Sequence, residues 1–249
     1  MAQVELLENE RIDDLGRRGF RIIQNSTKFC FGIDAVLLSW FTQVKEGQEI
    51  TDLGTGTGII PLMLLARNET GHYTGLEIQE DMAEMAARSV LLNDAAADIR
   101  IVTGDIKEAS AIFGKGVFDV VTTNPPYMPK GNGLVNPDSG KAVSRHEILC
   151  TLSDVIREAA LLLKTGGTLS MVHRPERLPE ILALMKANNL AADRLCFVHP
   201  YADKDATMVL LSGKKGGRCI PKTEPPLIVY ESPGIYTEKI REIYGDGRH

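Results

Sequence analysis

Residues 49–58 read EITDLGTGTG and join a short apolar strand pattern to a turn that contains three glycines. Residues 58–68 then have the apolar spacing of a helix, so the turn stands between a strand and a helix. Glycines at such a place permit a tight turn and let a ligand approach backbone N–H groups closely. The spacing differs from the GxGxxG of dinucleotide-binding proteins, whose helix N-terminus binds a pyrophosphate. The stretch favours a ligand site, although a plain turn between a strand and a helix stays open at this point.

The chain beyond this turn alternates strand patterns with helical patterns. Near-continuous apolar strands separated by amphipathic stretches are typical of a mostly parallel sheet with helices on both faces. The last two strands are joined only by the polar segment 199–205, which indicates a hairpin and an antiparallel strand near one edge. We therefore predict an α/β fold with a mostly parallel seven-stranded sheet. The expected strands are 49–54, 72–78, 99–104, 118–124, 168–174, 194–200 and 206–212, and the expected helices are 58–68, 80–93, 152–164 and 177–189.

Two segments lie outside this alternation. Residues 1–45 end in the helical pattern 34–41, for which Asp34 is a plausible N-cap. We expect residues 1–45 to form an extension that packs on the cofactor and substrate side of a main domain, residues 46–249. Residues 128–150 are rich in Gly, Pro and Asn and have no periodicity, which is typical of a binding loop.

Acidic residues follow the second and third strands at the edge where open α/β sheets bind ligands. Glu77 ends the second strand about 20 residues after the glycines, where a carboxylate can accept bonds from both ribose hydroxyls. Asp105 ends the third strand and can accept from an adenine amino group, while Ile106 supplies an apolar wall. Each acid alone is better explained as a helix cap or a surface charge, but together with the glycine turn they indicate a nucleoside-containing cofactor. The predicted cofactor residues are Asp52, Gly54, Thr55, Gly56, Gly58, Glu77, Asp105, Ile106 and Asn124.

The fourth strand ends in Asn124-Pro125-Pro126-Tyr127. Two prolines stop the strand and fix the backbone, so the Asn124 carboxamide and the Pro125 carbonyl are held outward as two acceptors. An NH2 group has two protons to donate to such a pair, and Tyr127 can stack on a planar substrate. We predict Asn124, Pro125 and Tyr127 as the catalytic residues of a methyl transfer to an amino nitrogen, driven by alignment and by acceptors facing the developing positive charge.

Composition and charge restrict the class of protein. The chain has 249 residues, 43% of them hydrophobic, and a formal net charge of −5, which does not indicate a general nucleic-acid binder. Two basic clusters without acidic residues, 17–28 and 212–222, are candidates for phosphate contact. The sequence contains no apolar run of membrane-spanning length and no secretory signal. Its four cysteines are far apart, which predicts free thiols in the cytoplasm, no disulfides and no metal site.

The DLGTGTG, GLEI, GD and NPPY series resembles class I methyltransferases, which use S-adenosylmethionine and have a Rossmann-like fold. The upstream residues 11–15, 22–25 and 28–38, with residues 145–147 and 214–217, are similar to the bacterial adenine-N6 methyltransferases of valine tRNA. The resemblance covers almost the whole chain. It implies an RNA substrate, an adenine near the anticodon, and a place for Phe31 and Gly32 beside the cofactor.

One departure from the family pattern concerns the substrate side of the site. Met128 and Pro129 follow Tyr127 where many members have an aromatic residue, which leaves the acceptor open. Arg145, His146 and Glu147 can close over the target or simply begin a helix. The alternatives are a methyltransferase of protein glutamine or of guanine N2 in ribosomal RNA, and a non-catalytic RNA-binding module.

Overall fold

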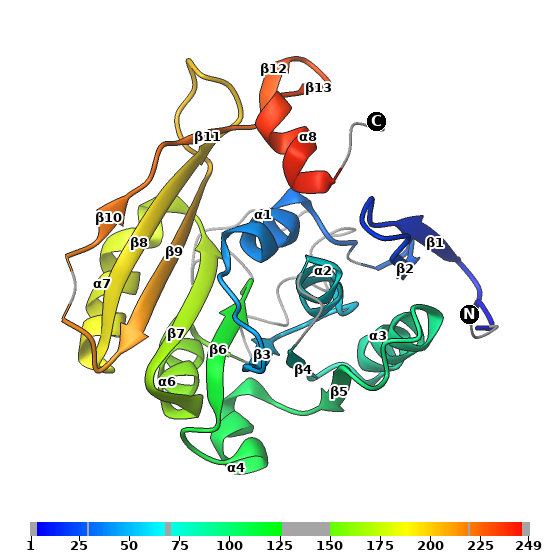
Figure 1. Ribbon diagram of the computed structural model, residues 1–249, viewed down its shortest axis with the longest axis horizontal. Coiled ribbons are helices and arrows are strands. Elements are labelled where there is room, and N and C mark those ends of the chain that lie inside the picture. Colours follow the sequence, from blue (N-terminus) through cyan, green and yellow to red (C-terminus); the bar gives the residue numbers. More distant parts are fainter. Residues whose placement is uncertain (1–3, 29, 68–70, 126–149, 219, 246–249) are drawn as a thin grey trace.

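A computed structural model describes residues 4–28, 30–67, 71–125, 150–218 and 220–245. Its main sheet contains seven long strands in the order β8-β9-β7-β6-β3-β4-β5, and the short β10 and β11 both pair with β8 (Figure 1). The long strands are β3 (Glu49–Leu53), β4 (His72–Glu77), β5 (Ile99–Thr103), β6 (Phe118–Thr123), β7 (Leu163–His173), β8 (Leu190–His199) and β9 (Met208–Lys215). The short ones are β10 (Lys222–Thr223) and β11 (Leu227–Ile228).

The direction of the strands follows the predicted pattern. β9 pairs antiparallel with both β7 and β8, while β3, β4, β5, β6 and β7 pair parallel with one another. The predicted α/β fold is thus confirmed, and the antiparallel strand β9 lies between β7 and β8, near the edge formed by β10 and β11. The other six long strands all end at one edge of the sheet, which we call the carboxyl edge. β9 ends at the opposite edge, which we call the amino edge.

Helices cover both faces of the sheet (Figure 1). One apolar core lies between the sheet and the helices α1 and α2, and it contains the buried Leu37, Leu62 and Leu210. The second core lies on the other face and contains the buried Ile156, Met185 and Val121. The helices are α1 (Ile33–Phe41), α2 (Ile59–Arg67), α3 (Glu80–Leu92), α4 (Ala109–Phe113), α6 (Leu152–Leu162), α7 (Leu178–Ala187) and α8 (Glu238–Tyr244), with the 3-10 turns η1 (Ile106–Glu108) and η2 (Pro175–Arg177).

The N-terminal residues form a hairpin that the sequence did not predict. β1 (Glu10–Asp14) pairs antiparallel with β2 (Arg21–Asn25), and the buried Ile23 of β2 packs with Met82 and Met85 of α3. The prediction of Asp34 as an N-cap is wrong, because α1 begins at Ile33 and its N-cap is Gly32. The carboxylate of Asp34 stands instead in the first turn of the helix. A division of the chain at residue 45 stays a prediction.

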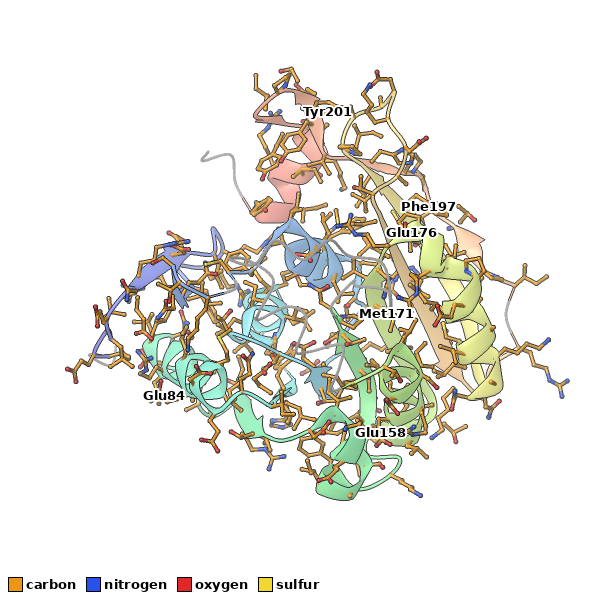
Figure 2. The ribbon with its side chains drawn as sticks, turned by 180° about the vertical axis from the view of Figure 1, so that it is seen from behind. Glu84, Glu158, Met171, Glu176, Phe197 and Tyr201 are labelled. Atoms are coloured by element: carbon orange, nitrogen blue, oxygen red, sulfur yellow. The ribbon has the colours of Figure 1, made fainter. Side chains whose placement is uncertain are left out.

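The C-terminal residues form a small unit that lies over α1. The two-stranded sheet of β12 (Tyr230–Ser232) and β13 (Ile235–Tyr236) leads into α8, which contacts α1. The rings of Tyr230 and Tyr236 stack with centroids 5.2 Å apart, and Tyr236 stacks on Tyr244 at 5.5 Å. Tyr201, in the loop between β8 and β9, lies 5.7 Å from Tyr230 and extends this row (Figure 2). The unit is therefore fastened to the carboxyl end of β8.

Candidate active site at the carboxyl edge of the sheet

The predicted residues gather where the strand order of the sheet reverses. β3 and β6 are neighbours, with Asp52 opposite Thr122 and Leu53 opposite Thr123. The chain after β3 proceeds to β4 and β5 on one side, whereas the chain after β6 proceeds to β7 on the other. Open α/β sheets bind their ligands at such a reversal, outside the carboxyl ends of the strands. The turn at 54–58 follows β3, and Asn124 follows β6.

Hydrogen bonds to β4 hold the glycine turn in place. The N–H groups of Gly54 and Thr55 donate to the carbonyl of Leu76 at 2.9 and 3.0 Å. Gly56 has φ +57°, and a Cβ placed on it would meet no protein atom within 4 Å. A Cβ on Gly58 would instead lie 3.3 Å from the Cβ of Ala86, so Gly58 permits close packing of α3. The two glycines therefore differ: Gly56 borders open space, and Gly58 serves the fold.

Glu77, the last residue of β4, joins that strand to the glycine turn. Its Oε2 accepts the Gly56 N–H at 2.9 Å, and its Oε1 accepts the Gln79 N–H at 3.0 Å. Glu77 is 5% exposed, so these two bonds fix a buried carboxylate. A carboxylate has about four acceptor positions. The Gln79 Nε2 also donates to Oε1 at 3.4 Å, so one position remains, on Oε2, where a ribose hydroxyl could donate.

Asp52 is a buried carboxylate beneath the same turn. Its Oδ1 accepts the Thr122 hydroxyl at 2.7 Å. Burial raises the pKa of Asp52 to about 7, and the bond from Thr122 only partly opposes this effect. Within the described residues, Asp52 Oδ2 and Thr55 Oγ1 are buried without a hydrogen-bond partner. Such atoms are costly, and a cationic group at this place would relieve the Asp52 carboxylate.

Asp105 and Ile106 lie at the end of β5. The Asp105 side chain caps η1 by accepting the Lys107 N–H at 2.9 Å, so the helix-cap role that the sequence left open is present. The Gly104 N–H donates to the carbonyl of Glu77, which ties this strand end to the glycine turn. The Ile106 side chain lies 3.6 Å from a Cβ placed on Gly54 and forms an apolar wall beside the turn.

Asn124 contacts the N-terminal part of the chain. Its Nδ2 donates to Oδ2 of Asp34 at 3.0 Å, across 90 residues of sequence. Pro125 follows as a buried residue. Phe31, half-buried just before α1, donates its N–H to Oε1 of the buried Gln24 at 3.0 Å, and Gly32 is exposed. The predicted Tyr127, Met128, Pro129, Arg145, His146 and Glu147, and most of the loop 128–150, lie outside the described residues.

Four contributors were not identified as such from the sequence. Thr122 donates to the buried carboxylate of Asp52, and Gln79 donates to that of Glu77. Neither residue belongs to a recognisable sequence motif. Gln24 holds Phe31, and Asp34 holds Asn124. A polar residue inside the apolar pattern of 22–25 was a signal for Gln24. For Asp34 the signal was visible but was interpreted as a helix cap.

The two basic clusters lie in different surroundings. In the first, Arg17 donates to the carbonyls of Glu242 and Ile243 at the end of α8, and Lys28 pairs with Asp81. In the second, Lys214 is the next-to-last residue of β9, the strand that ends at the amino edge. The second cluster is therefore remote from the edge that holds Asn124.

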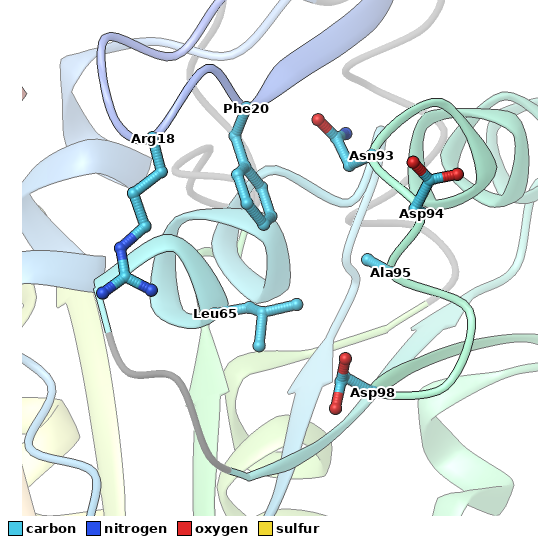
Figure 3. Close-up of a pocket in the computed structure, with 7 residues that line it drawn as sticks. All are labelled: Arg18, Phe20, Leu65, Asn93, Asp94, Ala95 and Asp98. Atoms are coloured by element: carbon cyan, nitrogen blue, oxygen red, sulfur yellow. The ribbon is translucent and has the colours of Figure 1, made fainter. Parts of the chain in front are cut away.

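A shallow cavity of about 160 Å³ also lies at the amino edge. Figure 3 shows Phe20 above Leu65 of α2, with Arg18 on one side and residues 93–98 on the other. The loop containing Asp98 precedes β5, at the beginning of that strand. None of the predicted site residues lines this cavity, so it is separate from the candidate active site.

The described residues contain no group of three His, Cys, Asp or Glu side chains able to hold a metal ion, and Cys30, Cys150 and Cys196 are free thiols. No helix within the described part of the chain has the length and apolar character that crossing a bilayer demands.

The chain is similar in sequence to known methyltransferases. Residues 31–188 match the model of the methyltransferase small domain family. A tRNA1(Val) (adenine(37)-N6)-methyltransferase of Tolumonas auensis is 30% identical, over 77% of this chain and 79% of that protein. Its namesake in Porphyromonas gingivalis strain ATCC 33277 is 29% identical over 88% of each chain.

Solved structures share the fold. A predicted O-methyltransferase of Agrobacterium tumefaciens has a TM-score of 0.68 and 27% identity, and the match covers 85% of this chain and 95% of that one. A geranyl diphosphate methyltransferase solved with S-adenosylmethionine has a TM-score of 0.53 at 15% identity, over 74% of this chain and 84% of that one. The second likeness concerns the fold alone.

Proposed function

This chain belongs to the methyltransferase small domain family, within the group of the tRNA1(Val) (adenine(37)-N6)-methyltransferases, and from this we propose that it methylates N6 of an adenine in tRNA. The proposed cofactor is S-adenosylmethionine, and the proposed adenine is the one at position 37, beside the anticodon. The observation that supports the reaction is the place of Asn124: it follows β6 directly beside the β3 turn that borders the cofactor site.

The residues present fit S-adenosylmethionine. Glu77 retains an acceptor position on Oε2 for a ribose hydroxyl, Gly56 leaves open space at the turn, and the orphaned carboxylate oxygen of Asp52 suits a cationic ammonium group. Ile106 offers an apolar wall for a purine. Phe31 and Gly32 are proposed to lie beside the methionine end. When bound, the cofactor supplies an electrophilic methyl group.

The residues of this chain bind and orient the amine. In the proposed complex, the Asn124 Oδ1 and the Pro125 carbonyl each accept one proton of the adenine NH2, which turns the nitrogen lone pair toward the methyl donor. No general base is needed before attack, because the nitrogen loses its proton as positive charge develops on it. The two acceptor oxygens stabilise that charge, and alignment supplies much of the remaining rate gain. Tyr127 is proposed to stack on the base.

Other acceptors fit less well. A hydroxyl has one proton, so it would leave one of the two acceptors unused, which disfavours an O-methyltransferase. A glutamine amide could use both acceptors, but the relatives that cover most of this chain are named for tRNA. A purely binding module has no need for amino-group acceptors beside a cofactor turn.

The RNA substrate is expected to present an unpaired adenine, because the target nitrogen must leave the base stack to reach the site. Among the described residues of the first basic cluster, Arg17 and Lys28 already bond within the chain, so these two cations are engaged before any phosphate binds. We therefore expect the affinity for RNA to fall with a shallow slope as the salt concentration rises. The cytoplasmic location expected from the cysteine pattern belongs to the same proposal.

Methyl transfer to competing substrates tests this function. The protein is incubated with labelled S-adenosylmethionine and, in parallel, unmodified bulk tRNA, ribosomal RNA and a release factor. Label in tRNA that digests to N6-methyladenosine supports the proposal. Label confined to guanine in ribosomal RNA or to a release-factor glutamine would replace it by the corresponding alternative.

A further inference from the structure

Asp34 lies where it can control the orientation of Asn124. It is the second residue of α1, and its two carboxylate oxygens have different partners. Oδ1 accepts the N–H of Ala35 at 2.9 Å, and Oδ2 accepts Nδ2 of Asn124 at 3.0 Å. A Cβ placed on Gly32 would lie 2.8 Å from the Asp34 Oδ1, so the glycine before the helix leaves room for this carboxylate.

The chemistry of the pair allows only one orientation of the carboxamide. An amide side chain has a donor end and an acceptor end of almost equal shape, so space alone does not choose between them. An ionised carboxylate only accepts hydrogen bonds, and the N-terminal turn of α1 favours its negative charge. The NH2 end of Asn124 must therefore face Asp34, since the reverse orientation would set two oxygens against each other. The carbonyl end then points away from Asp34.

We propose that Asp34 is the positioning residue of the methyl transfer, holding Asn124 with its oxygen toward the substrate amine. This inference rests on the proposed function, because it assigns the acceptor end of Asn124 to the amine. Asp34 itself does not touch the substrate. Its second contribution is a negative charge behind Asn124, which favours the positive charge that develops on the nitrogen.

The substitution Asp34→Asn distinguishes a role in orienting the Asn124 carboxamide from a role in which the side chain at position 34 only fills space. The N–H of Ala35 requires an acceptor, so the new Asn keeps its oxygen there and turns its NH2 toward Asn124. Asn124 then reverses and presents its own NH2 to the amine. We expect kcat to fall about 100-fold, at least as far as in Asp34→Ala, with the Kd of S-adenosylmethionine unchanged within threefold. A space-filling role predicts the opposite order, with Asp34→Asn near the parent and Asp34→Ala impaired.

An exchange of the two side chains tests the pair directly. Asn124→Asp alone places two carboxylates against each other and should lower both kcat and the melting temperature. The double variant Asp34→Asn/Asn124→Asp restores one donor facing one acceptor, and the oxygen of the new Asp that points away from position 34 is proposed to accept from the amine. We expect it to regain the melting temperature lost in Asn124→Asp and to exceed the kcat of either single variant about tenfold. Glu180→Gln, a first-turn carboxylate of α7 paired with Arg177, is the matched control and should keep the parent kcat.

A measurement independent of turnover distinguishes this inference from the proposed function. The ¹⁵N–¹H signals of the Asn124 carboxamide are assigned by their loss in Asn124→Ala, and they should shift in Asp34→Asn but not in Glu180→Gln. If the parent protein methylates no tRNA, the proposed function fails, while the carboxamide shift and the recovered melting temperature still report the Asp34–Asn124 pair. Parent-like kcat in Asp34→Asn, or a double variant no more stable than Asn124→Asp, would overturn the positioning role.

Discussion

Glu77 Oε2 accepts the backbone N–H of Gly56 at 2.9 Å, which fastens the end of β4 to the turn that follows β3. The bond joins two consecutive strand–helix units at their carboxyl edge. It fixes both the carboxylate proposed to bind the ribose and the glycine that borders open space. Both partners are therefore expected to affect cofactor binding, by different physical routes.

Glu77→Ala should weaken binding of S-adenosylmethionine about 10- to 100-fold, because it removes both the proposed ribose acceptor and the anchor of the turn. Glu77→Gln keeps the shape and one acceptor oxygen, so we expect an intermediate Kd. Isothermal titration calorimetry measures both. Unchanged affinity in Glu77→Ala would contradict the ribose contact.

Gly56→Ala should weaken cofactor binding more than it lowers stability. A Cβ there meets no protein atom within 4 Å but enters the space assigned to the cofactor. The matched control is Gly47→Ala, which has φ +71° and equally open surroundings in a loop before β3. Both variants pay roughly 1–2 kcal/mol for the left-handed backbone. Equal Kd values in the two variants, measured beside their melting temperatures, would show that the space at Gly56 is not used.

Asn124→Ala should reduce turnover at least about 100-fold while the Kd of the cofactor stays within a few fold. Its carboxamide oxygen is proposed to contact the amine, and the contacts proposed to hold most of the cofactor come from β3, β4 and β5. Single-turnover methyl transfer and equilibrium binding give the two numbers. Parallel loss of both would show that Asn124 serves cofactor binding or folding instead.

Asp52 should give the protein a characteristic dependence of stability on pH. Its pKa is about 7 in the fold against 3.8 as the ordinary value, so the folded protein retains a proton that the unfolded chain has lost between these pH values. This group therefore lowers the free energy of unfolding by about 4 kcal/mol at most as pH rises from about 4 to 7. Above pH 7 its contribution no longer changes.

The substitution Asp52→Asn isolates this effect. Burial also lowers the pKa of His173 to about 4, which makes the fold lose stability as pH falls, but this slope is common to both proteins. The stability of Asp52→Asn relative to the parent should rise from pH 4 to 7. Denaturant unfolding without cofactor measures it. A difference that is constant across this range would mean that Asp52 titrates normally.

The sheet and the cofactor edge could be predicted from the sequence because both depend on local patterns. Apolar strands between amphipathic helices predict a parallel sheet, and strand ends that carry Gly54, Glu77 and Asp105 must meet at its carboxyl edge. β1 and β2 escaped prediction because their sequences, ERIDD and RIIQN, lack a clear alternation, and pairing with each other and with α3 stabilises them.

The link between Asp34 and Asn124 could not be predicted, for a physical reason. An acidic residue in a first helical turn is fully explained by the helix itself. Its actual partner is 90 residues away and becomes a neighbour only when α1 covers the sheet. Likewise, whether Gly56 or Gly58 borders the open space depends on where α3 packs. The spacing of the residues along the sequence identified the candidate site residues, and only the tertiary contacts show which role each of them has.

The central claim is tested most directly by methyl transfer to a valine tRNA transcript and to the same transcript with guanine in place of adenine 37. The account predicts close to one N6-methyladenosine per parent transcript and none in the substituted one. Equal labelling of the two transcripts, or no labelling of either by a folded preparation that binds S-adenosylmethionine, would contradict it.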